Sequence, residues 1–163
     1  MVALAVEVFL LVRENSDLKS AQSITQVGIG DILNLQGLEP LTPNLKFEQS
    51  GEMLLFVFTT SCGYCKDNLP QWELLSSLAK DSGVESIAIS LDTQVATADY
   101  AVEHGLTYPV LIATDPNEFG KSNGIGRVPQ TIIRTQSGAV QAVWIGKLED
   151  ERVAEILSLL TTN

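Results

Sequence analysis

The sequence is poor in cysteine and histidine. Its 163 residues include two cysteines, Cys62 and Cys65, and one histidine, His104. Two cysteines exclude a disulfide-rich scaffold, and a hydrophobic content of 45% is enough to bury a core without disulfide staples. A zinc site usually needs about four ligands, and His104 falls on a different predicted helix from the cysteines. We therefore expect no bound metal.

Basic residues are also scarce. Ten Lys and Arg residues stand against twenty Asp and Glu residues, which gives a formal net charge of −10. This balance argues against nucleic acid or an anionic membrane surface as a partner. The acidic residues are scattered without a long run, which is typical of a solvated surface.

The apolar N-terminus is too short for a membrane span. Residues 1–12 are nearly all apolar, broken by Glu7, whereas a transmembrane helix needs about 20 residues. No basic segment precedes them, so a signal peptide is not indicated. Two readings stay open: the trailing end of a membrane anchor followed by a stalk, or an amphipathic helix packed on the domain or on another copy. We divide the chain into an N-terminal helix (residues 1–23) and one folded domain (residues 27–163).

The two cysteines lie where a predicted strand meets a predicted helix. Residues 53–58 form a continuous apolar run of strand length, as expected of a central strand covered on both faces. A helix follows from the cysteine motif to about residue 80, and Pro70 should kink it. The cysteine pair therefore sits at the start of a helix.

The rest of the chain alternates strands and helices. We predict short extended pieces over residues 27–35 and 44–48, strands over 84–91, 108–113, 128–135 and 139–145, and helices over 93–104, 117–123 and 149–160. Alternation implies parallel right-handed crossovers, and the last two strands form a hairpin. The sequence therefore predicts an α/β fold with a mixed central sheet and helices on both faces.

The spacing of the cysteines predicts a redox dithiol. Cys62 falls at or just before the first helical turn, where free backbone N–H groups favour a thiolate. Cys65 follows nearly one turn later and is partly shielded, so Cys62 should attack a partner's disulfide and Cys65 resolve the mixed disulfide. Gly63 leaves the sulfur accessible, and Tyr64 tunes its surroundings.

Val128-Pro129 is the second candidate feature. An X-Pro bond leading into a strand can be cis, which would leave the Val128 backbone free to pair with an extended substrate segment. A proline at a strand start is ordinarily trans, so the cis prediction depends on its closeness to the cysteine motif.

Together these residues resemble the thioredoxin superfamily. The matching features are Cys62-Gly63-Tyr64-Cys65 opening a helix, Pro70 at the kink, Val128-Pro129 at the cis-proline position, and the final hairpin and helix. Over residues 27–160 the chain is most similar to the TlpA/ResA-like, redoxin-related branch. That resemblance implies a thioredoxin-like fold with extra N-terminal strands and a βα insertion, here within residues 84–123.

The resemblance also implies a function. Proteins of this branch reduce protein disulfides outside the bacterial cytoplasm, in cytochrome c maturation or a related thiol pathway, and many are tethered by an N-terminal helix. The expected partners are protein thiols or disulfides and an upstream thiol–disulfide electron donor. No cofactor is implied beyond the redox-active Cys62–Cys65 disulfide.

Three positions depart from the family's usual pattern. Ser61 replaces the tryptophan before the first cysteine, Phe56 replaces the buried acidic residue of thioredoxins, and Asn68 replaces the acidic residue that follows the motif in ResA-like proteins. The route by which Cys65 exchanges its proton is therefore left open.

Alternative functions remain. The Gly63-Tyr64 dipeptide also matches DsbC-type isomerases, so an isomerase or oxidase stays open, as does a thioredoxin-like binding module with a structural disulfide. A peroxiredoxin is discounted: Thr59 lies three residues before Cys62, as that family requires, but Leu55 stands where its proline would fall.

The remaining conspicuous side chains receive ordinary interpretations. We expect His104 to end a helix, Trp72 and Trp144 to pack in the interior, and Arg127 to be exposed.

Overall fold

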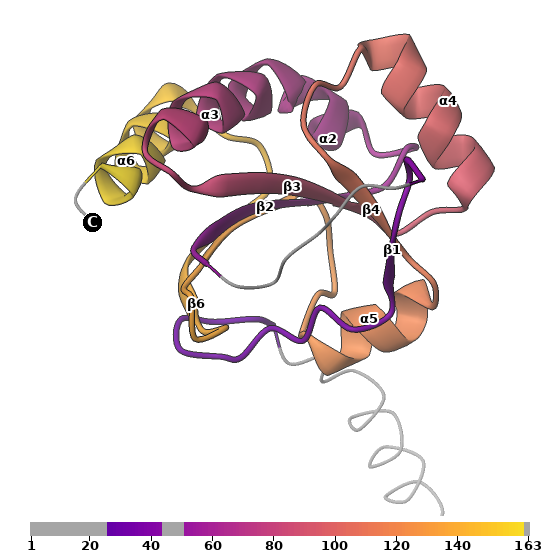
Figure 1. The fold of residues 1–163 in the computed structure, drawn as a ribbon, viewed down its shortest axis with the longest axis horizontal. Coiled ribbons are helices and arrows are strands. Elements are labelled where there is room, and N and C mark those ends of the chain that lie inside the picture. The colour runs from indigo at the N-terminus through magenta and orange to yellow at the C-terminus, as the bar shows by residue number, and fades with distance from the viewer. Residues whose placement is uncertain (1–25, 44–50, 162–163) are drawn as a thin grey trace, which may run out of the picture.

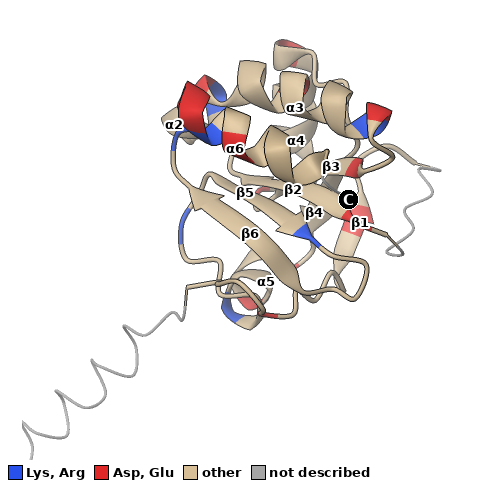
Figure 2. Ribbon diagram, turned by 90° about the vertical axis from the view of Figure 1, so that its left-hand side faces the viewer, with Lys and Arg blue, Asp and Glu red and all other residues tan. Residues whose placement is uncertain are grey.

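A mixed six-stranded sheet organises the protein. The structure is a computed structural model that describes residues 26–43 and 51–161. The strand order is β1-β4-β3-β2-β5-β6 (Figures 1 and 2). Pairs β2–β3 and β3–β4 are parallel, and the other pairs are antiparallel. The strands are β1 (Leu38–Pro40), β2 (Met53–Phe58), β3 (Glu85–Ser90), β4 (Val110–Ala113), β5 (Gln130–Arg134) and β6 (Val140–Ile145).

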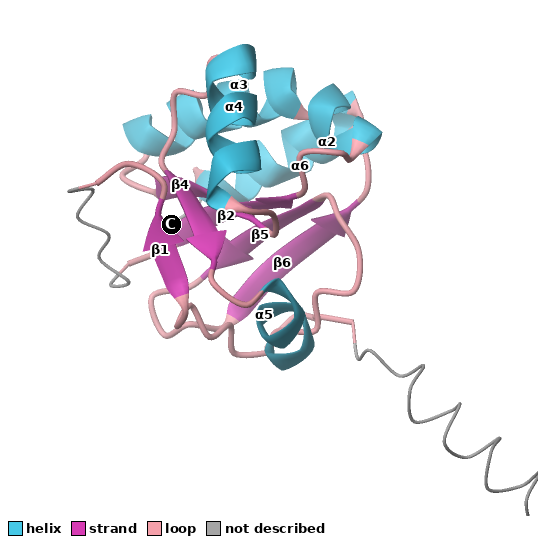
Figure 3. Ribbon diagram, turned by 90° about the vertical axis from the view of Figure 1, so that its right-hand side faces the viewer, coloured by secondary structure: helices cyan, strands magenta, loops and turns pink. Residues whose placement is uncertain are grey.

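Helices cover both faces of this sheet, as predicted. One face carries α2 (Gly63–Asp67), α3 (Leu69–Asp81), α4 (Gln94–His104) and α6 (Asp150–Leu160). The other carries α5 (Pro116–Ser122) and the segment that precedes β1 (Figures 1 and 3). The acidic residues are spread over several elements rather than gathered (Figure 2), in agreement with a solvated surface.

The central strand β2 supplies the core on both faces. All six of its residues are buried. Leu54, Phe56 and Phe58 belong to the cluster on the α3 and α6 side, while Leu55 and Val57 belong to the cluster on the α5 side. Each such side chain contributes about 1.5–3 kcal/mol of hydrophobic stabilisation. The apolar run therefore fixes the strand whose end carries the cysteines.

The helix after the motif is divided rather than only kinked. A single helix to about residue 80 was expected, but α2 ends at Asp67 and α3 begins at Leu69, with Asn68 between them. Pro70 lies in the first turn of α3, where its missing N–H costs no intrahelical hydrogen bond. The proline thus starts a new helix.

The segment before β2 differs most from expectation. Residues 27–35 contain a turn and one isolated bridge, Ile32 to Ala139, and no strand. The three-residue strand β1 pairs with β4 at the sheet edge; the resemblance led us to expect extra N-terminal strands, but not at residues 38–40. The predicted piece over residues 44–48 and the predicted helix over residues 1–23 lie outside the described residues.

Two other strands are shorter than predicted. β4 begins at Val110 and β5 at Gln130, in each case just after a proline. Pro109 and Pro129 cannot donate to a strand ladder, so the ladders start after them. Across residues 26–43 and 51–161, no helix combines the length and apolar character needed to span a membrane.

Candidate active site

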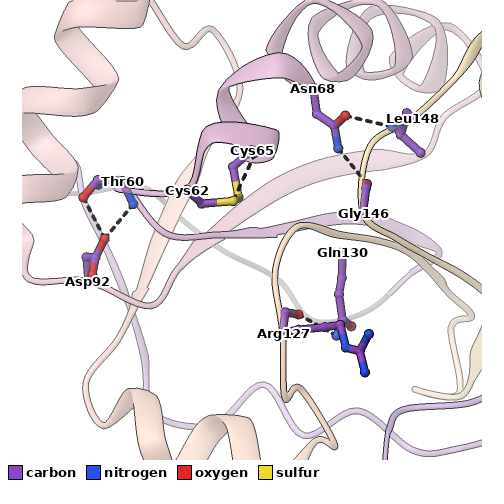
Figure 4. Close-up of a disulfide and its surroundings, with 9 residues drawn as sticks. All are labelled: Thr60, Cys62, Cys65, Asn68, Asp92, Arg127, Gln130, Gly146 and Leu148. Atoms are coloured by element: carbon purple, nitrogen blue, oxygen red, sulfur yellow. Dashed lines mark hydrogen bonds between the residues drawn. A yellow bond between two sulfur atoms is a disulfide. The ribbon is translucent and has the colours of Figure 1, made fainter.

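The cysteine pair lies at the carboxyl end of the central strand. Cys62 is the N-cap of α2, and Cys65 lies within it. The two form a disulfide with their Cα atoms 5.2 Å apart (Figure 4). Cys62 is partly exposed, whereas Cys65 is fully buried. Of the two sulfurs, that of Cys62 is the one that an approaching protein can reach.

The helix start also provides a donor to the exposed sulfur. The Cys65 backbone N–H donates to Cys62 Sγ over 3.1 Å. Such a bond is stronger when the sulfur is a thiolate, because a charged acceptor strengthens a hydrogen bond. This geometry is as expected for Cys62 in the first helical turn, and it favours Cys62 as the nucleophile.

Gly63 and Tyr64 leave the approach to Cys62 open. Gly63 is exposed, and a Cβ placed there would meet nothing within 4 Å. The Tyr64 side chain is 64% exposed, large for an aromatic residue. The structure therefore places both residues on the surface around the disulfide.

Val128 and Pro129 come to the same end of the sheet. Their peptide bond is cis, as predicted. The antiparallel register pairs Val57, near the end of β2, with Gln130, the first residue of β5. Val128 and Pro129, which directly precede β5, therefore lie beside the end of β2. The Pro129 carbonyl accepts a hydrogen bond from Gly146 N–H over 2.9 Å, which fixes the loop.

Asn68 is committed to structural contacts. It is fully buried; its Nδ2 donates to Gly146 O over 3.1 Å, and its Oδ1 accepts from Leu148 N–H over 2.8 Å (Figure 4). These bonds join the α2–α3 break to the loop before α6. Asn68 is therefore no proton acceptor for Cys65, and sequence reasoning missed its two partners.

The position at which thioredoxins carry a buried acidic residue is occupied here by an apolar side chain. Phe56 is buried and stacks on Trp72, with ring centroids 5.1 Å apart. Trp72 Nε1 donates to Thr131 Oγ1 over 2.9 Å. Trp72 is thus a packing residue, as interpreted from the sequence, and so is Trp144, which is 8% exposed and donates to Glu155.

A shallow hollow of about 210 Å³ borders Cys62 on the side of α4. Its lining includes Lys66, Tyr100, Glu103 and His104. His104 ends α4, as expected, and its ring meets Tyr100 edge-on at 4.4 Å. Burial, and then the Glu103 charge, raise the pKa of Tyr100 above its ordinary value, so its hydroxyl stays neutral at physiological pH. The sequence did not indicate that α4 reaches this site.

The larger hollows lie away from the cysteines. One of about 480 Å³ lies between β1 and the start of α4, and another of about 760 Å³ lies beside α3 and β3. Neither includes Cys62 or Cys65. Among these hollows, the accessible cysteine, Cys62, therefore borders only the shallow one. Within the described part of the chain, no three His, Cys, Asp or Glu side chains are grouped to hold a metal ion.

Two residues near the motif were not foreseen as a pair. Thr60 donates twice to the carboxylate of Asp92 (Figure 4). The two residues are 32 positions apart and lie just after β2 and β3. Only the register of those two strands could have indicated the contact. Arg127 is exposed, as expected, and its carbonyl accepts a hydrogen bond from Gln130.

Comparisons with known proteins agree with this geometry. The profile of the Redoxin family matches residues 19–159. The thiol-disulfide oxidoreductase ResA of Halalkalibacterium halodurans is 28% identical over 127 residues, covering 77% of this chain and 72% of that protein. The ResA of Oceanobacillus iheyensis is 33% identical over 113 residues, covering 68% and 57%. Among solved structures, a thiol-disulfide isomerase from Corynebacterium glutamicum superposes with a TM-score of 0.67 at 20% identity, over 82% of this chain and 97% of the other.

Proposed function

Because the chain belongs to the Redoxin family and is a ResA-like thiol–disulfide oxidoreductase, we propose that it works in the reducing direction on protein disulfides. The reducing direction is supported by the likeness to the ResA proteins, and the observation that carries the dithiol chemistry is the unequal exposure of the two sulfurs. Cys62 is reachable and accepts a hydrogen bond from Cys65 N–H, while Cys65 is buried behind it.

The reaction follows from this arrangement. In the reduced protein, the Cys62 thiolate attacks one sulfur of the substrate disulfide, forming a mixed disulfide and releasing the other sulfur as a thiolate that takes up a proton. Cys65 then loses its proton and attacks Cys62 Sγ, which releases the second substrate thiol. Two electrons pass to the substrate, and the Cys62–Cys65 disulfide remains.

Substrate docking uses the surface around Cys62. Gly63 and Tyr64 form the exposed side of the motif, and Val128 and Pro129 lie just before the start of β5, at the end of the sheet where β2 leads into the motif. In our proposal an extended substrate segment lies against the Val128 backbone and brings its cysteine to Cys62. An upstream thiol–disulfide donor then reduces the pair again.

We place this activity outside the bacterial cytoplasm, in cytochrome c maturation or a related thiol pathway. The support is the resemblance to the TlpA/ResA-like branch, many of whose members are membrane-tethered. In this proposal, residues 1–23 contribute to the tether and residues 27–163 form the catalytic domain. Alkaline phosphatase fused after residue 163 at the protein's own chromosomal locus should be active; inactivity there would contradict the location.

An isomerase or oxidase is the second candidate, favoured by the Gly63-Tyr64 dipeptide. The equilibrium constant between the Cys62–Cys65 pair and glutathione gives the reduction potential of the pair, which distinguishes a reductase from an oxidase. A potential near that of thioredoxin, about −270 mV, supports a reductase, whereas one near that of DsbA, about −120 mV, reverses the assignment.

The activity itself is tested by reduction of insulin in the presence of dithiothreitol. We expect turnover by the wild type, loss of turnover in Cys62→Ser, and stable mixed disulfides with partners in Cys65→Ser. An exposed serine on α3 supplies the matched control, Ser77→Ala, which should keep full activity. No turnover by the wild type would favour a binding module with a structural disulfide, and turnover that survives Cys62→Ser would show that the activity does not come from this cysteine pair.

A further inference from the structure

The turn that leads into Cys62 is held by a carboxylate from the neighbouring strand. Asp92 Oδ2 accepts a hydrogen bond from the Thr60 backbone N–H over 2.6 Å and another from Thr60 Oγ1 over 2.7 Å (Figure 4). The first is short for an N–H donor, as expected when the acceptor is charged. Within the same turn, Cys62 N–H donates to Thr59 O over 3.3 Å. The carboxylate therefore holds the turn whose last residue is the nucleophile.

The parallel register of β2 and β3 creates this contact. Phe58 lies opposite Ser90, and Leu91 N–H donates to Phe58 O over 3.0 Å just past the strand ends. Thr60 and Asp92 each follow two residues after that last pair. They meet because the strands are in register, so the contact does not depend on a long flexible side chain.

Asp92 is in turn held by a network of hydroxyl groups that joins the end of β3 to the start of α4. Asp92 N–H donates to Ser90 Oγ over 3.2 Å, Ser90 Oγ lies 2.7 Å from Thr97 Oγ1, and Thr97 Oγ1 donates to Thr93 O over 2.8 Å. Ser90 and Thr97 are fully buried. Because each hydroxyl is bonded to the next, this network fixes the backbone on which the Asp92 carboxylate is carried.

We propose that Asp92 is a positioning residue for Cys62. Through its bonds to Thr60, Asp92 fixes the direction of the Cys62 side chain, and through its negative charge it lowers the stability of the Cys62 thiolate. The inference rests on the proposed redox function of the pair. The carboxylate oxygen lies within about 10 Å of the Cys62 nitrogen, because two residues span at most about 3.6 Å each beyond the 2.6 Å bond.

The charge has a defined effect on the redox equilibrium. A negative charge bonded to the turn that leads into Cys62 disfavours a second negative charge on Cys62 Sγ through the Coulomb interaction. It therefore destabilises the reduced, thiolate-bearing state relative to the disulfide and makes the pair a stronger reductant. Asp92 opposes the stabilisation that the Cys65 N–H gives to the thiolate, and therefore favours transfer of electrons from the cysteine pair to the substrate.

Other charged groups face the same sulfur. Lys66 on α2 and Glu103 and His104 on α4 line the hollow beside Cys62. All three stay unchanged in the variants below, so their influence is common to every measurement and the comparison isolates Asp92.

The deciding variant is Asp92→Asn, which removes the charge and keeps an oxygen acceptor for Thr60. The pKa of the Cys62 thiol, from the pH dependence of iodoacetamide alkylation in a Cys65→Ser background, should fall by about half a unit or more. In the two-cysteine protein, the equilibrium with glutathione should shift about three- to tenfold toward the dithiol, which corresponds to about 15–30 mV.

Three further variants separate position from charge. Asp92→Ala should give the same shifts and also slow insulin reduction, because Thr60 loses its acceptor. Thr60→Val keeps the charge and removes one hydrogen bond, so it should slow insulin reduction without the glutathione shift. Glu39→Gln is the matched control: this exposed carboxylate lines the same hollow as Asp92 but is not bonded to Thr60, and it should change neither quantity.

The outcomes are distinguishable. If Asp92→Asn leaves both the thiol pKa and the glutathione equilibrium at wild-type values, or if Glu39→Gln shifts them equally, the inference is wrong. If Asp92→Ala fails to fold, Asp92→Asn still decides. If the wild type does not reduce insulin, the proposed function fails, while the alkylation measurement still tests Asp92 by itself.

Discussion

Asn68 shows how one side chain can change the role of a position. An amide donates and accepts at once, so Asn68 satisfies both Gly146 O and Leu148 N–H, at 3.1 and 2.8 Å. An ionised carboxylate could not donate to the Gly146 carbonyl. At position 68, where the resemblance to ResA-like proteins leads us to expect an acidic residue, this chain therefore has a structural link between the motif helix and the loop before α6.

We expect Asn68→Ala to lower the free energy of unfolding by about 2–5 kcal/mol, because it leaves the partly buried Gly146 carbonyl and the buried Leu148 N–H without their Asn68 partners. Urea unfolding followed by circular dichroism measures this loss. Asn117→Ala, at an exposed position on α5, is the control and should stay within about 0.5 kcal/mol of the wild type. Equal midpoints for the two variants would contradict the structural role of Asn68.

At the scale of elements, α5 is fitted closely to the loop that follows it. Gly120 lies within this helix, is buried, and its carbonyl accepts from Ile125 N–H over 2.8 Å. A Cβ on Gly120 would lie 2.9 Å from the Ile125 carbonyl oxygen, a backbone atom that cannot rotate away. The glycine allows α5 to lie against the chain that leads to Val128 and Pro129.

Gly120→Ala should therefore cost about 1–3 kcal/mol of stability, since the helix or the loop must shift. The matched substitution is Gly63→Ala in α2, where a Cβ meets nothing within 4 Å, and it should cost less than about 0.5 kcal/mol. Thermal unfolding of the two variants gives the comparison. A Gly120→Ala protein as stable as Gly63→Ala would show that α5 is loosely held.

Most elements could be predicted because their signals are local. The apolar run of β2, the Thr93 and Gly105 ends of α4, and the cysteine spacing are each read from neighbouring residues. The strand β1 could not, because three residues containing Pro40 carry no alternation and pair with a strand some 70 positions away. The partners of Asn68 and the Thr60–Asp92 contact likewise depend on how distant segments come together.

For the whole molecule, the redox state and stability are linked. A strongly reducing pair is one whose folded protein favours the disulfide more than an unfolded chain does, so the oxidised protein should be the more stable form. We predict a higher urea midpoint without dithiothreitol than with it. Cys62→Ser, which cannot form the disulfide, should unfold at the same midpoint in both conditions. A more stable reduced protein would instead support an oxidase.

The edge strand β1 has a consequence for self-association. An uncovered sheet edge offers unpaired N–H and C=O groups to other chains and invites aggregation. β1 covers β4, and its own outer side is short and carries Glu39 and Pro40, a charge and a residue that cannot donate. At the far side of the sheet, Gly30 N–H and Asp31 O bond to Val140. β1 therefore protects the β4 edge of the sheet against strand-to-strand pairing with another copy of the protein, and the contact at Val140 covers the start of β6 at the opposite edge.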